Sequence, residues 1–180
     1  MFASVTLDEL VAERRQLDAS YGRWIEHVGQ YARSGAWAAD GYVSAGAALA
    51  DRCAMDRGVA RSHVTLAAKL QRLESVRDAL AAGEISRKHA LLIAKAHTVA
   101  RAEVIEELQA SLTEFARHVP PRALGELINR VTDAIDGDDG DGNDDKKRDR
   151  RRLAASVSLD KMVFLDGLGD PTSAEIASPR

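Results

Sequence analysis

The chain has 180 residues, of which 45% are hydrophobic and 29% charged, so it can bury the core of one domain and is too apolar for general disorder. Its single cysteine excludes a disulfide framework and a cysteine-rich zinc site, and no apolar run approaches the roughly 20 residues of a membrane-spanning helix. The formal net charge is −3 and no secretory signal is visible, so we expect a cytoplasmic protein without a membrane partner.

The first predicted helix begins at a capping box and carries one apolar stripe. In Thr6-Leu7-Asp8-Glu9, the Thr6 hydroxyl can accept from the amide of Glu9 while the Glu9 carboxylate reaches back. The stripe predicts an amphipathic helix of about seven turns that ends near Gly35. Two uses stay open: packing inside the molecule, which we favour, and a homodimer seam along this N-terminal helix. The stripe consists of Leu10, Leu17, Tyr21, Trp24, Val28 and Tyr31.

Helix caps and breakers predict six further helices before residue 136. Asp40 can cap the second helix, from Gly41 to Cys53, and Asp56 can cap the third, which is expected over residues 58–73. Pro121 suits the first position of the last helix. The bulk of the protein is therefore predicted to be all-α. The remaining helices are expected at residues 75–82, 86–97, 101–118 and 121–135.

The composition changes abruptly after the helical part. Residues 136–152 pass from aspartates to lysines and arginines with no apolar residue from 137 onward, which predicts a flexible linker. Residues 153–165 alternate and then turn, which predicts a β-hairpin, and a helix begins at Asp170-Pro171. Because that helix has hardly two turns before Arg180, we expect a fragment or a truncated product. The predicted division is 1–135, 136–152 and 153–180.

The sequence patterns of several catalytic and ligand sites do not occur in this chain. It holds no phosphate-binding glycine loop and no pair of histidines at zincin spacing. An EF-hand beginning at Asp139 would need Gly where Asp144 stands and Glu where Arg150 stands. We therefore expect no catalytic residue, cofactor or metal ligand, and no metal-dependent DNA cleavage by this chain.

The distribution of basic residues suggests DNA as a partner. Between Arg57 and Arg72, and again between Ile85 and Ala102, the chain carries cations and no carboxylate. The helices from Asp40 to Leu73 form a compact pair compatible with helix-turn-helix geometry, in which the second helix enters the major groove. The block from Lys146 to Arg152 can bind phosphates or be neutralised by the neighbouring aspartates. The candidate nucleic-acid-binding residues are Arg57, Arg61, Lys69, Arg72, Arg87, Lys88, Lys95, Lys146, Lys147 and Arg148.

A turn after this pair carries a family resemblance. Residues 79–90, with Gly83, Ile85, Ser86 and His89, are similar to the turn that follows the recognition helix in ParB-like partition proteins. Gly83 can end one helix, Ile85 can staple the turn and Ser86 can cap the next helix. Together with the segments at 59–73, 119–120 and 152–169, this turn resembles the actinobacterial domain of unknown function that precedes HNH endonuclease modules, the mycobacterial thirteen-E-twelve repeat family.

The resemblance covers roughly residues 5–177 and implies a DNA-associated protein. In that family a metal-binding ββα module with Cys and His follows the helical region, and this sequence ends before such a module. The family's catalytic residues therefore have no counterparts here. We expect a mainly α, multi-helix domain with a helix-turn-helix-like pair and a small C-terminal β-hairpin, acting as a non-catalytic, DNA-associated module. The alternatives are a helical oligomerisation or scaffold module and a non-functional remnant of a truncated mobile-element nuclease.

Overall fold

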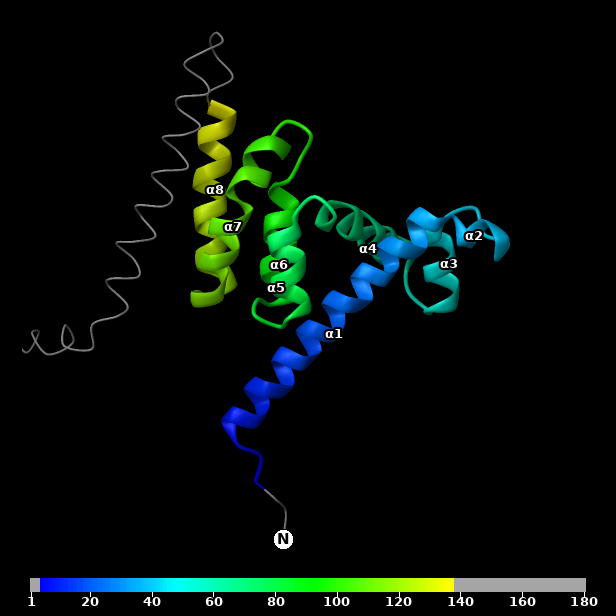
Figure 1. The fold of residues 1–180 in the computed structure, drawn as a ribbon, viewed down its shortest axis with the longest axis horizontal. Helices are drawn as coiled ribbons and strands as arrows, with labels where there is room; N and C mark the ends of the chain where they lie inside the picture. The colour runs from blue at the N-terminus through cyan, green and yellow to red at the C-terminus, as the bar shows by residue number, and fades with distance from the viewer. Residues whose placement is uncertain (1–3, 138–180) are drawn as a thin grey trace, which may run out of the picture. The chain divides into compact units, whose positions relative to one another are not determined.

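The computed structural model describes residues 4–137, which form eight helices and no strand. The mainly α prediction is confirmed for this part of the chain, whereas the predicted hairpin and nearly all of the predicted linker lie outside the described residues. Figure 1 shows the order of the helices. They are α1 (Leu7–Ser34), α2 (Ala36–Ala39), α3 (Ala45–Arg52), α4 (Arg57–Leu70), α5 (Glu74–Ala81), α6 (Arg87–Ala96), α7 (Ala102–His118) and α8 (Pro121–Gly137).

The two ends of α1 form as the sequence predicts. The Thr6 hydroxyl accepts from the amide of Glu9 at 3.2 Å, and the Glu9 carboxylate accepts from the Thr6 amide at 2.7 Å, so both halves of the capping box are present. The helix ends at Gly35, whose φ of 72° lies in the left-handed region that favours glycine. Such local hydrogen bonds define a helix of 28 residues.

The predicted start of the second helix is wrong. It begins at Ala45 instead of Gly41, because the Ser44 hydroxyl caps it by accepting from the amide of Ala47. Asp40, the predicted cap, instead accepts a hydrogen bond from the Tyr31 hydroxyl at 2.7 Å. The short helix α2 occupies residues before Asp40 for which the sequence pattern predicts no helix, and brings the helices before residue 136 to eight instead of seven.

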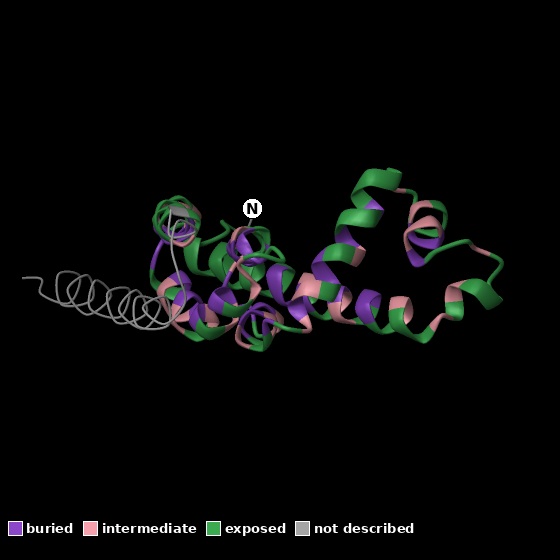
Figure 2. Ribbon diagram, turned by 90° about the horizontal axis from the view of Figure 1, so that it is seen from above, coloured by how far each residue is buried: buried purple, intermediate pink, exposed green. Residues whose placement is uncertain are grey.

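The core lies where α1, α4, α5, α6 and α7 pack against one another. α1 packs on both α4 and α5, while α4 also contacts α3 and α6. Buried and exposed positions alternate along the helices, as expected for amphipathic helices around a shared core (Figure 2). α1 and α5 approach each other closely, because a Cβ built on Gly22 would lie 2.8 Å from the Ala81 nitrogen.

The turn between α5 and α6 confirms the mechanics predicted for residues 83–89. Gly83 has a φ of 72°, Ile85 is 2% exposed, and Ser86 and His89 form a capping box at the start of α6. A contact that the sequence did not predict also stabilises the start of α6. The buried carboxylate of Asp18 in α1 accepts from the backbone amide of Arg87 at 2.8 Å and thus caps α6 from a distant helix.

The residues up to Thr132 form one compact unit, and a second unit begins at Asp133. α8 ends at Gly137, two residues beyond its predicted end. None of the helices in the described part of the chain is long and apolar enough to cross a membrane.

Candidate nucleic-acid interface

A basic groove lies between α4 and α6, the two helices on which the sequence placed most of its candidate residues. We call it the α4–α6 groove; its volume is about 490 Å³. Four cations line it and no carboxylate does. Its lining residues are Arg61, Ser62, Thr65, Leu66 and Lys69 from α4, and Lys88, Leu91, Leu92, Ala94 and Lys95 from α6.

The helical repeat explains why these side chains meet. Arg61, Thr65 and Lys69 stand four residues apart, so they follow one side of α4. Lys88 and Lys95 stand seven apart and follow one side of α6. Since α4 and α6 are in contact, the two rows face the same hollow. The sequence predicted these cations as candidate residues, and the structure brings Arg61, Lys69, Lys88 and Lys95 together around one hollow.

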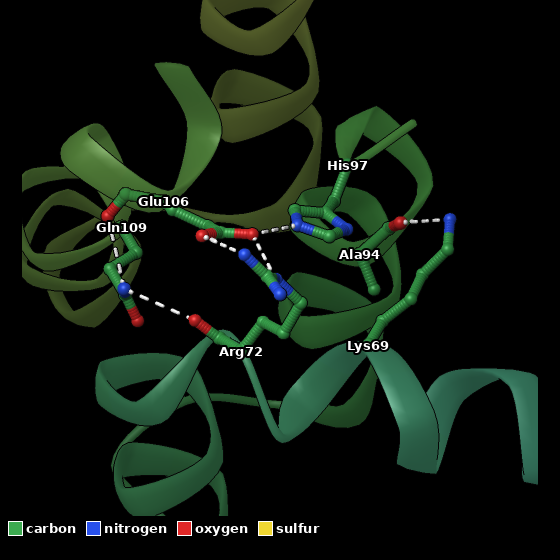
Figure 3. A network of polar contacts seen from close by, with 6 residues as sticks. All are labelled: Lys69, Arg72, Ala94, His97, Glu106 and Gln109. Carbon is green, nitrogen blue, oxygen red and sulfur yellow. Dashed lines mark hydrogen bonds and ion pairs between the residues drawn. The ribbon is translucent and has the colours of Figure 1, made fainter. Parts of the chain in front are cut away.

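Lys69 holds one end of this groove together. Its ammonium group donates a hydrogen bond of 2.7 Å to the carbonyl of Ala94, near the C-terminus of α6 (Figure 3). A cation is favoured at that end of a helix, where carbonyl groups lack helical partners. Partial burial lowers the pKa of Lys69. The side chain therefore bridges the two helices and contributes a half-buried charge to the groove.

Arg72 lies outside the groove and pairs with α7 instead. Its guanidinium donates to both carboxylate oxygens of Glu106, at 2.5 and 3.0 Å, and His97 Nε2 lies 2.7 Å from the same carboxylate (Figure 3). Hydrogen bonds from Arg72 and then from His97 lower the pKa of Glu106 to about 2. The charge of Arg72 is thus matched by Glu106, and this predicted residue joins the turn after α4 to α7.

Arg87 is also directed away from the groove. Its guanidinium carbon lies 4.5 Å from the centre of the Tyr21 ring, which is a cation–π contact with α1. Burial raises the pKa of Tyr21, whose hydroxyl lies 3.2 Å from His63 Nδ1. Arg87 therefore helps to attach α6 to α1.

Arg57 lines a second hollow, of about 550 Å³, formed by residues of α1, α2, α3 and α4 and the segment before α3. Arg61 borders both this hollow and the α4–α6 groove. Arg57 and Arg61 are thus neighbours on the exposed side of α4. The remaining candidates, Lys146, Lys147 and Arg148, lie outside the described residues.

The Glu106 contacts predict a loss of stability in acid. Folding lowers the pKa of Glu106 from 4.5 to about 2. The ionised carboxylate therefore contributes to the free energy of unfolding above about pH 4.5, and this contribution is lost as the pH falls toward 2. We expect the Glu106→Gln variant to unfold at a lower urea concentration than the parent at neutral pH, with the difference shrinking in acid. Glu107→Gln, at an exposed position on the same helix, is the control. A pH-independent difference for Glu106→Gln would contradict the role given to its charge.

Comparison with models of protein families matches residues 4–176 to the family described as Domain of unknown function (DUF222). No curated protein and no solved structure matches the chain.

Proposed function

The chain belongs to the DUF222 family, and on the α4–α6 groove we propose that it is a non-catalytic module that binds the phosphate backbone of duplex DNA. The match supports the resemblance drawn from the sequence to a domain of unknown function. The association of that family with HNH nuclease modules stays a prediction. The observation that carries the proposal is the meeting of four cations from two helices around a hollow without a carboxylate.

The state of these cations supports binding to an anion. Arg61, Lys88 and Lys95 are exposed, and none of them forms an ion pair with another residue of the described part. Elsewhere, Arg117 and Arg122 are paired with glutamates. Cations without a carboxylate partner keep their charge available for phosphates, whose neutralisation releases counterions from the duplex.

The position of α4 suggests how the groove is presented to DNA. The short helix α3 packs on α4 after a four-residue turn at 53–56, an arrangement that resembles a helix-turn-helix pair. Arg57 and Arg61 occupy the first turns of α4, the end of a recognition helix that normally meets base edges. In this proposal Lys88 and Lys95 contact phosphates, and Arg57 or Arg61 reads a base.

The experiment removes the exposed cations of the groove. We expect the Arg61→Ala/Lys88→Ala/Lys95→Ala variant to bind a labelled duplex about tenfold or more weakly at low salt, measured by fluorescence anisotropy. The slope of log affinity against log salt should fall by roughly one for each phosphate that the variant no longer neutralises. The matched control is Arg23→Ala/Arg33→Ala/Arg130→Ala, which removes the same charge from exposed positions outside the groove. Circular dichroism checks that both variants fold.

A third variant tests the rival source of binding. It neutralises the basic residues between positions 146 and 152, which would bind any polyanion without sequence preference. If only this variant loses affinity, the groove is not the DNA site and the proposal is wrong. If the parent protein does not bind DNA at low salt, the scaffold or remnant alternative is favoured instead.

A further inference from the structure

The first turns of α1 expose an apolar stripe. We define the α1 stripe as Leu7, Leu10, Val11 and Leu17, with Arg14 in its middle. Its four apolar side chains are 74, 52, 43 and 64% exposed, in that order. Spacings of three, four and seven residues place all of them on one side of the helix. Large apolar side chains gathered in this way on a soluble surface mark an interaction site.

The rest of α1 shows that this exposure is a local feature. The buried residues of the helix begin at Asp18 and continue to Gly29, where α1 packs on α4 and α5. Trp24, farther along the stripe predicted from the sequence, packs edge-on against His63 with ring centres 4.8 Å apart. The internal packing that we favoured from the sequence is therefore confirmed for the second half of α1, whereas the described part of the chain leaves the first half exposed (Figure 1).

We propose that the α1 stripe binds the same stripe of a second copy of this chain, with the two helices antiparallel. The argument rests on the charges that flank the stripe. Asp8, Glu9 and Glu13 make its first part acidic, and Arg14 and Arg15 make the following part basic. An antiparallel pair sets the acidic part of each helix beside the basic part of the other, whereas a parallel pair sets Arg14 beside its own copy.

The surroundings of the stripe fit such a partner. Leu10 and Val11 border a hollow of about 340 Å³, closed on its other side by the turn at residues 83–86. Arg14, Arg15, Asp18 and Glu84 also line this hollow, so it offers both apolar and charged contacts to the second copy. Arg14 donates to both oxygens of Asp18, at 3.0 and 2.8 Å, so its charge is partly matched at the centre of the interface. In a two-fold pair each copy uses the same surface, so the interface is closed. Such a pair forms a dimer and does not extend into a longer assembly.

The experiment measures the mass of the full chain in solution. We expect the parent to form a reversible dimer in sedimentation equilibrium, and Leu10→Glu/Leu17→Glu to be monomeric with an unchanged circular dichroism spectrum, because both side chains are exposed. Val43→Glu/Val99→Glu is the matched control, since these valines are 87 and 102% exposed at other sites, and it should still dimerise. A monomeric parent at every concentration, or a dimer that survives in the Leu10/Leu17 variant, would overturn the proposal.

A charge exchange tests the orientation without disturbing the apolar residues. Asp8→Arg alone and Arg15→Asp alone should each weaken the dimer, because each puts like charges side by side in an antiparallel pair. The double variant should restore it. If the double variant is no stronger than the single ones, the antiparallel arrangement is wrong. This outcome is independent of DNA binding, which the groove variants measure separately.

Discussion

Replacing Gly22 with alanine is expected to lower the free energy of unfolding by about 1–3 kcal/mol. The new Cβ would lie 2.8 Å from both the Ala81 nitrogen and the Leu80 carbonyl carbon of α5. These are backbone atoms, so no change of side-chain rotamer relieves the contact, and one of the two helices has to move. The loss should exceed the gain of about 1 kcal/mol that alanine gives over glycine inside a helix. Urea unfolding followed by circular dichroism measures it.

Gly29→Ala, in the same helix, is the matched control. Its Cβ would first meet the end of the Arg33 side chain, at 3.2 Å, and the methyl group of Ala67, at 3.4 Å. The arginine can turn away, so the substitution should be close to neutral once the helical preference of alanine is included. Equal destabilisation by the two substitutions would show that the approach of α1 to α5 does not limit the fold.

Replacing Ile85 with alanine is expected to cost about 2–5 kcal/mol of stability, the range for truncating a large buried aliphatic side chain. Ile85 is 2% exposed, and the turn that holds it is bounded by Gly83 and by the capping box of Ser86. A Cβ on Gly83 would lie 2.5 Å from the Arg15 carbonyl oxygen, so the turn sits directly against α1 and has little freedom to close a cavity. Thermal or urea unfolding gives the difference.

Val99→Ala is the reference for this substitution, because Val99 is 102% exposed in the loop before α7. It should change stability by no more than about 0.5 kcal/mol. If Ile85→Ala were as mild as Val99→Ala, the turn would not be part of the core that joins α1, α5 and α6.

Features that depend on neighbours in the sequence were predictable. The capping box at Thr6–Glu9, the Ser86 cap of α6 and the left-handed glycines at the ends of α1 and α5 each arise from contacts within a few residues. The amphipathic spacing also placed Arg61 and Lys69 on one side of α4. These local rules were enough for the all-α class of the described part and for the row of cations on α4.

Features that depend on distant partners were not predictable in this way. Asp40 is a plausible cap by its local sequence, yet its carboxylate accepts from the Tyr31 hydroxyl instead. Arg72 belongs to the same basic run as Arg61, yet Glu106, 34 residues away, neutralises it. Nothing in the local sequence of α6 indicates that Asp18 caps its first turn. A run of basic residues therefore indicates which cations are candidates for a binding site. The packing of the helices then decides which of them are paired with a carboxylate and which are not.

The two sides of α4 differ in how well they tolerate substitutions. On the inner side, Ala60, Leu66 and Leu70 are at most 4% exposed and pack in the core. The outer side carries Arg61 and Thr65, where a substitution typically shifts stability by no more than about 0.5 kcal/mol. Mutations can therefore accumulate along the rim of the groove while selection for folding acts on the opposite side. Related chains can therefore differ in the residues along this rim and still keep this helical frame.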